Sequence, residues 1–148
     1  MSTRRIFIAV VPPENIINSL IKTIRSYKKE SWGKDVKWIK PEHLHLTLKF
    51  TGQVESNKIA KISSAVKAAT HGFWGLTAEI SKLRVFPKPL FPKVLSAGID
   101  ENTSLLKLAE NIENSLYTIG ISKEKRKFKG HITLGRYKKF ISQLTKGR

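Results

Sequence analysis

A chain of 148 residues has the length of one ordinary domain, or of two small lobes that share a core. It carries 28 Lys and Arg against 11 Asp and Glu, a net charge of +17, which makes nucleic acid or phosphorylated ligands the leading partners. The lack of cysteine excludes disulfides, thiolate nucleophiles and cysteine-based zinc sites. No stretch approaches the roughly 20 apolar residues of a membrane span, so a soluble, cytoplasmic protein without a membrane partner is the default expectation.

The start of the chain predicts a buried strand followed by an amphipathic helix. Ile6 to Val11 form a continuous apolar run rich in β-branched residues, which is typical of a buried strand. Pro12 and Pro13 end this run and suit the first turn of a helix. Apolar residues then recur at three- and four-residue spacing, so the helix should extend to about Lys29.

A short strand over residues 36–39 and a bend at Pro41-Glu42 lead into a longer strand with alternating side chains. Gly52 ends this strand. Ser56 is placed to cap a second amphipathic helix, whose exposed face is rich in lysine. Residues 72–85 then alternate apolar and polar side chains, which favours another strand.

Three prolines predict an irregular loop over Phe86–Lys93. Its aromatics and lysines suit either base stacking with phosphate attraction, or a surface loop anchored by its phenylalanines. Residues 94–99 form a further strand, and Asp100-Glu101-Asn102 begins a third amphipathic helix that ends near Gly120.

Two copies of one pattern stand out, His45-Leu46-Thr47-Leu48 and, 86 positions later, His131-Ile132-Thr133-Leu134. Side chains alternate along a strand, so each histidine and its threonine face the same way, roughly 6.6 to 6.8 Å apart. A single His-x-Thr is weak evidence, since an ordinary strand histidine explains most cases. Random placement, however, gives roughly 0.03 copies of His-x-Thr-Leu per chain. The pair therefore indicates function.

Two histidines that face one cleft can act as base and acid in the same turnover. Phosphodiester hydrolysis needs both a base and an acid, because water is deprotonated on one side of phosphorus while the leaving oxygen is protonated on the other. Donors must also neutralise the two non-bridging oxygens. The hypothesis is that His45 and His131 divide the proton transfers and that Thr47 and Thr133 bind those oxygens.

No metal or other cofactor is required by this hypothesis. Hydrolases that use metals on phosphate esters usually collect carboxylates, and neither motif supplies one. His43 and His45 could be two metal ligands on one strand face, but the motif strand carries no Cys, Asp or Glu to complete such a site. His71, at a helix end, is most simply a capping or surface residue.

The paired motifs resemble those of the two-histidine (2H) phosphoesterase superfamily, and within it the RNA 2′,3′-cyclic phosphodiesterases, also called 2′-5′ RNA ligases. The resemblance covers nearly the whole chain. Its motif blocks are specific and its outer stretches are supportive: Arg5–Val10, Trp38–Gly52, Phe86-Pro87, Val94–Ile99 and Phe128–Arg136.

The resemblance implies one bilobal α+β domain over residues 1–148, with pseudo-twofold symmetry, antiparallel sheets, outer helices and a central groove that carries both motif strands. It implies opening of an RNA-terminal 2′,3′-cyclic phosphate to a 2′-phosphate, with tRNA fragments as a candidate source of such ends and a monomer as the expected state. In this chain His45 would protonate the departing 3′ oxygen and His131 would activate water. The reverse reaction, 2′-5′ ligation, would use the same residues in exchanged roles.

Alternation also suggests residues that contact the substrate. Lys49, Lys129 and Tyr137 share the motif face of their strands if the alternation is regular. Arg136 follows the second motif closely, although regular alternation aims it the other way. We include all four as candidate substrate contacts.

The chain departs from relatives in three places. Gly130 stands where many relatives have proline, and His43 stands where asparagine is usual. Only 17 residues follow His131, so the domain is expected to be short at its C-terminus and to expose a sheet edge.

Two other functions fit the same sequence. A noncatalytic RNA-binding module would keep the fold and the basic surface without turnover. A phosphodiesterase of a small cyclic nucleotide or of an ADP-ribose cyclic phosphate would keep the fold and the chemistry. Such a small ligand needs only a local basic pocket, so the net charge of +17 argues against it.

Overall fold

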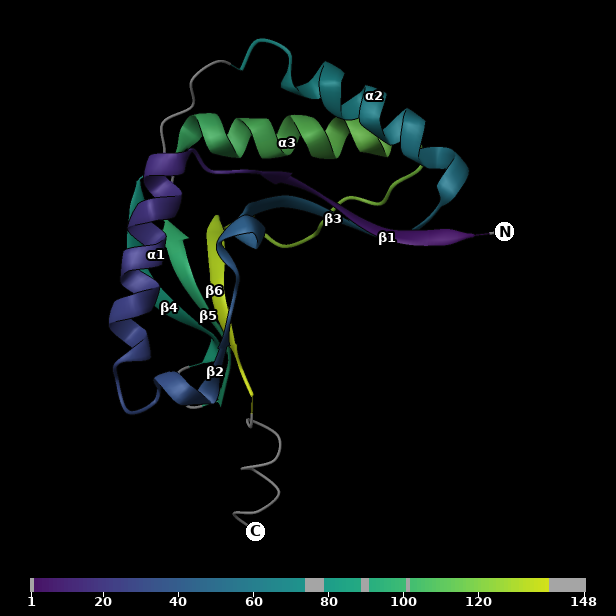
Figure 1. Ribbon diagram of the computed structural model, residues 1–148. Helices are drawn as coiled ribbons and strands as arrows, with labels where there is room; N and C mark the ends of the chain where they lie inside the picture. The colour runs from purple at the N-terminus through teal and green to yellow at the C-terminus, as the bar shows by residue number, and fades with distance from the viewer. Residues whose placement is uncertain (1, 74–78, 89–90, 101, 139–148) are drawn as a thin grey trace. The chain divides into compact units, whose positions relative to one another are not determined.

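The computed structural model describes residues 2–73, 79–88, 91–100 and 102–138 (Figure 1). Within these residues the helices and strands follow in the order β1 (Thr3–Val10), α1 (Glu14–Lys28), β2 (Val36–Trp38), β3 (Leu46–Glu55), α2 (Ile59–Thr70), β4 (Ile80–Lys88), β5 (Phe91–Ile99), α3 (Thr103–Tyr117) and β6 (His131–Tyr137). The strand pairs with a defined register are antiparallel. The predicted α+β class is therefore confirmed. None of the described helices has both the length and the apolar character needed to cross a membrane.

The chain divides into two compact units, each assembled from three segments. Unit 1 contains Met1–Val10, Thr47–Glu79 and Asp100–Gly130, and unit 2 contains Val11–Leu46, Ile80–Ile99 and His131–Arg148. The units are interleaved along the sequence, so they do not coincide with two consecutive halves of the chain. The expected pseudo-twofold symmetry and central groove remain predictions.

Unit 1 is built around the packing of α2 against α3. The apolar positions of α3 recur every three or four residues and are fully buried at Ile112 and Leu116. The Ser115 hydroxyl donates a hydrogen bond to the Ala65 carbonyl of α2, 2.9 Å away. The expected start of α3 is confirmed, because the Asn102 side chain accepts a hydrogen bond from the Leu105 amide.

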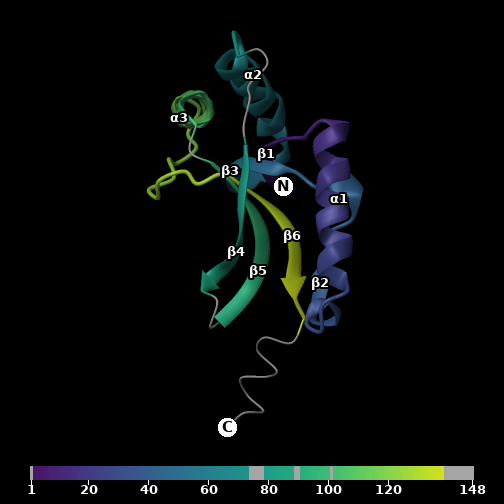
Figure 2. The same ribbon diagram turned by 90° about the vertical axis from the view of Figure 1, so that its left-hand side faces the viewer.

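Unit 2 is built around β6, which has a partner on each edge. β5 pairs along one edge from Gly98 opposite His131 to Val94 opposite Arg136, and β2 pairs with the end of the other edge. α1 lies along one face of these strands (Figure 2). Its Leu20 and Ile24 are buried, as are the apolar residues of the strands, Leu95, Ala97, Ile132 and Leu134.

An aromatic cluster joins the end of α1 to β2 in unit 2. The Trp32 ring lies between the rings of Tyr27 and Trp38, at centroid distances of 5.6 and 6.3 Å. The Trp38 indole also donates a hydrogen bond to the Gly33 carbonyl, 3.0 Å away. These contacts join β2 to the end of α1, and backbone pairing of β2 with β6 places Trp38 opposite Gly135.

A β-bulge interrupts the pairing of β6 with β5. Thr133 lies opposite Ser96, but the next residue of β5 in the pairing, Leu95, lies opposite Gly135. Leu134 is therefore an extra residue on β6. A bulge of this kind changes the phase of side-chain alternation beyond it.

Four local predictions from the sequence were wrong. The first strand, β1, was expected to be buried but has no fully buried residue, and Phe7 and Val10 are 48% and 37% exposed. β3 does not end at Gly52 but continues to Glu55.

The other two concern the start of α2 and the segment between β4 and β5. Ser56 does not cap α2 with its side chain. It begins a short 3-10 turn, and its hydroxyl bonds instead with that of Ser2, 2.7 Å away. The irregular loop predicted over Phe86–Lys93 is mostly strand, because backbone pairing of β4 with β5 continues to Lys88 opposite Phe91. Residues 74–78 of the strand predicted over 72–85 lie outside the described residues.

Replacing Gly135 with alanine is expected to destabilise the protein by about 1 to 3 kcal/mol. A Cβ at this position would overlap the buried Val36 side chain and would lie 3.3 Å from the Trp38 ring. Denaturant unfolding of Gly135→Ala measures the change. Ser63→Ala, on the exposed side of α2, is the control and should stay within about 0.5 kcal/mol of the native protein. Equal stability of the two variants would contradict this packing.

Candidate active site

The two motif segments are neighbours in unit 2. Leu46, at the start of β3, pairs with Ile132 of β6 in antiparallel register. Both side chains are buried, at 6% and 2% exposure, and residues directly opposite one another in a sheet face the same side. The residues on either side of them, His45, His131 and Thr133, are half-buried and belong to the other face.

Continuing this register places His45 directly opposite Thr133. His131 lies two residues before Thr133, so it is the diagonal neighbour of His45. Diagonal neighbours on one face of an antiparallel pair lie about 7 to 8 Å apart. Two imidazoles at this spacing can reach opposite sides of one phosphorus atom.

The ring orientation of His45 is fixed by its own segment. Its Nδ1 lies 2.6 Å from the carbonyl oxygen of His43. A carbonyl oxygen only accepts hydrogen bonds, so Nδ1 carries a proton and donates it. The nitrogen that would exchange a proton with a substrate is therefore Nε2.

Thr47, the remaining motif residue, belongs to unit 1 and is half-buried. It follows the buried Leu46 in β3 and precedes the buried Leu48. Its role at the phosphate remains a prediction.

The bulge at Leu134 exchanges the expected roles of Arg136 and Tyr137. Arg136 lies opposite Val94, which shares a strand face with Ser96, the partner of Thr133. Arg136 is therefore on the motif face and is exposed. Tyr137 lies opposite the buried Val36, on the other face, and burial raises the pKa of its phenol. The prediction that Tyr137 shares the motif face was wrong.

Two cations on this face were not predicted from the sequence. Lys37 of β2 lies opposite Arg136, and Arg84 of β4 lies opposite Ser96. Both are exposed. Neither side chain forms a hydrogen bond or ion pair with another of the described residues. The pairing of β6 with β2 and of β5 with β4 places them there, and Arg84 is far from both motifs in sequence.

Comparison with known proteins identifies the family. Residues 10–95, more than half of the chain, match the family model described as LigT like Phosphoesterase. The chain is 32% identical over 134 residues to the RNA 2′,3′-cyclic phosphodiesterase of Thermotoga maritima, covering 90% of this chain and 70% of that protein. It is also 32% identical over 136 residues to the enzyme of the same name from Archaeoglobus fulgidus, covering 91% and 73%. The chain belongs to the LigT-like phosphoesterase family.

Solved structures agree with this membership. A protein of Thermus thermophilus aligns with a TM-score of 0.68 at 28% identity, over 91% of this chain and 75% of its own. LigT of E. coli in apo form aligns with a TM-score of 0.72 at 25% identity, over 92% and 73%. The family match spans His45 and Thr47, and the whole-chain alignments extend over most of the remaining sequence.

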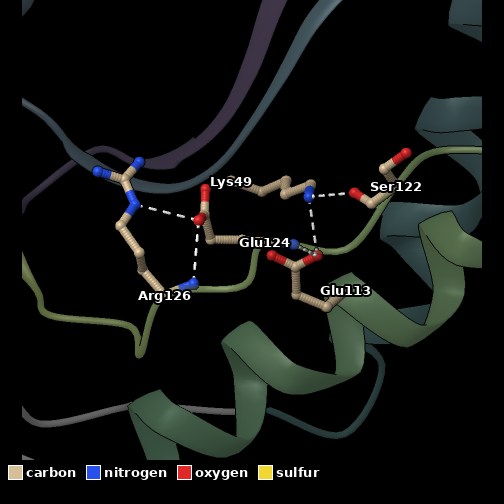
Figure 3. Close-up of polar contacts among 5 residues, drawn as sticks. All are labelled: Lys49, Glu113, Ser122, Glu124 and Arg126. Carbon is tan, nitrogen blue, oxygen red and sulfur yellow. Dashed lines mark hydrogen bonds and ion pairs between the residues drawn. The ribbon is translucent and has the colours of Figure 1, made fainter.

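Lys49 of this LigT-like phosphoesterase is held inside unit 1, which contradicts its predicted role as a substrate contact. It is only 5% exposed. Its Nζ donates to a Glu113 carboxylate oxygen at 2.8 Å and to the Ser122 carbonyl at 2.7 Å (Figure 3). The same Glu113 oxygen accepts from the Glu124 amide, 3.2 Å away. Lys49 therefore anchors the basic segment 122–129.

That basic segment holds a second ion pair, at its exposed surface. The Glu124 carboxylate accepts hydrogen bonds from Nε and from the backbone amide of Arg126, at 3.1 and 3.0 Å (Figure 3). The side-chain bond is the main reason that the pKa of Glu124 falls to about 2. Lys129 is exposed and lies outside β6, so strand alternation does not define its direction. Its contact with substrate remains a prediction.

No group of three or more His, Asp or Glu side chains that could hold a metal ion occurs within the described residues. His43 is exposed and His45 is half-buried, with Nδ1 bonded to the His43 carbonyl.

Lys49→Met is expected to lower the free energy of unfolding by about 3 kcal/mol, because it leaves Glu113 without its buried cation. Denaturant unfolding measures this loss. The matched control, Lys67→Met, changes an exposed lysine of α2 and should lie within about 0.5 kcal/mol of the native protein. If Lys49 acted only on substrate, its replacement would be as mild as the control.

Proposed function

We propose that this protein hydrolyses RNA-terminal 2′,3′-cyclic phosphates to 2′-phosphates, as a phosphodiesterase that uses two histidines and no metal. The pairing of Leu46 with Ile132 carries the proposal, because it makes His45 and His131 diagonal neighbours on one face. Two relatives at 32% identity that are named RNA 2′,3′-cyclic phosphodiesterase support it.

His131 acts as the general base in this reaction. It removes a proton from water, and the resulting hydroxide attacks phosphorus. The bond between phosphorus and the 3′ oxygen breaks, and the imidazolium form of His45 gives its Nε2 proton to that oxygen. One proton is gained by His131 and one is lost by His45, so exchange with solvent restores both groups.

The threonines, together with Arg136 and Lys37, stabilise the charge that develops on phosphorus. Thr133 lies beside both histidines and donates to one non-bridging oxygen, and Thr47 donates to the other. Arg136 and Lys37 lie directly opposite one another, an arrangement of like charges that is unfavourable without an anion between them. A bound phosphate supplies that anion, and the fork of Arg136 can donate two hydrogen bonds to it.

The substrate is RNA, with tRNA fragments as one source of cyclic ends, and the enzyme acts as a cytoplasmic monomer. The net charge of +17 favours a polyanion over a small cyclic nucleotide. Ligation of a cyclic phosphate to a 5′-hydroxyl is the reverse reaction. His45 and His131 would then exchange their roles as acid and base.

Replacing either histidine with alanine should lower the rate of hydrolysis by about 10²- to 10⁴-fold, the usual contribution of one acid or base. The assay follows conversion of a short RNA with a 2′,3′-cyclic phosphate end to a 2′-phosphate end, in EDTA, with native protein, His45→Ala and His131→Ala. His71→Ala, an exposed histidine at the end of α2, should retain the native rate. RNA binding without turnover by folded native protein would instead identify a noncatalytic binding module.

The position of the bulge makes Arg136 and Tyr137 a matched pair of variants. Arg136→Gln should lower kcat/KM by roughly 10- to 100-fold, since a charge-assisted hydrogen bond to phosphate is lost. Tyr137→Phe should leave kcat/KM within about threefold, because its phenol belongs to the opposite face. Steady-state kinetics on the same RNA measure both. The reverse order of effects would show that regular alternation continues through Leu134.

A further inference from the structure

Arg84 is on the motif face of unit 2 in the same row of side chains as the reacting groups. Across neighbouring strands this row runs from His45 to Thr133, then to Ser96 and Arg84. The last two steps are direct pairings, and the first continues the register of Leu46 with Ile132. Residues directly opposite one another share a face, so all four belong to the same side of the sheet.

Arg84 is the outermost member of this row and is exposed, two strands away from Thr133. At about 4.8 Å per strand, its backbone lies about 10 Å from that of Thr133. Ser96, between them, is wholly buried, and its hydroxyl has no hydrogen-bond partner in the described part of the chain. The groups of the row that a ligand can reach are therefore the exposed Arg84 on one side of Ser96 and the half-buried Thr133 and His45 on the other.

No carboxylate among the described residues pairs with the Arg84 guanidinium. In an RNA end, the phosphate that precedes the terminal one is separated from it by a ribose. This internal phosphate therefore lies to one side of the terminal cyclic phosphate that reacts. A guanidinium suits such a phosphate, because its planar donors match two phosphate oxygens.

We propose that Arg84 binds the phosphodiester that precedes the cyclic phosphate, and so makes the enzyme prefer the end of an RNA chain to a 2′,3′-cyclic mononucleotide. The proposal rests on the proposed function and adds a specificity-determining residue to it. Arg84 contacts the substrate at a group that does not react. Its contribution should therefore depend on the charge of that group and be absent where the group is absent.

The test compares three substrates at one low ionic strength. They are a 2′,3′-cyclic mononucleotide, a dinucleotide with the same cyclic end, and that dinucleotide with an uncharged methylphosphonate in place of its internal phosphate. The native protein should show about tenfold higher kcat/KM on the charged dinucleotide than on the uncharged one. Arg84→Gln should reduce that ratio to near 1 and leave the mononucleotide rate unchanged.

Arg25→Gln is the matched control, because Arg25 is an exposed arginine of α1 in the same unit. It should keep the native ratio, which would separate a local contact from a general effect of net charge. A ratio that Arg84→Gln leaves at its native value would overturn the proposal, even with hydrolysis intact. An equal loss on all three substrates would also overturn it.

Failure of the proposed function would look different. The native protein would then hydrolyse none of the three substrates. In that case the dissociation constants of the two dinucleotides, measured by fluorescence anisotropy, replace kcat/KM. A native preference for the charged dinucleotide that disappears in Arg84→Gln would support the role of Arg84, and equal affinities in the native protein would exclude it.

Discussion

The site depends on one backbone pairing, that of Leu46 with Ile132. Both side chains are buried, so sliding the strands by one residue would turn each apolar side chain to the polar face and each motif residue into the core. The cost of such a slip fixes the register strongly. The apolar residue in the middle of each His-x-Thr motif is therefore as important to the position of the histidines as the backbone that carries them.

The alternation within each motif could be predicted from the sequence, because it is a local property of a strand. The side-chain alternation of β6 beyond Thr133 could not be predicted from the sequence. It depends on how Leu95 and Ser96 of β5 pair with β6, and these residues lie almost 40 positions earlier in the chain. A regular strand would have directed Tyr137 to the motif face. The extra residue at Leu134 directs Arg136 there and leaves the phenol against the buried Val36.

Lys49 illustrates a second limit of the sequence. Its place in the alternating strand agrees with a substrate contact, and a lysine is the usual residue for such a role. The alternating pattern does not show where Glu113 lies, because Glu113 is 64 residues away and belongs to α3. Burial of a lysine is tolerated when a carboxylate and a carbonyl accept its protons, as Glu113 and Ser122 do here. The fold, through the packing of α3, decides whether this cation is structural or functional.

The distribution of acidic groups distinguishes two kinds of cation in this chain. In unit 1, Glu113 and Glu124 neutralise Lys49 and Arg126, so those charges are largely satisfied within the protein. On the motif face of unit 2, described cations stand opposite one another or opposite a neutral serine, with no carboxylate paired to them. Such an arrangement costs stability through repulsion in the free protein and repays it only when an anion binds. The excess of 28 basic over 11 acidic residues is therefore left uncompensated on the face that carries the two histidines, which is where the proposed function needs it.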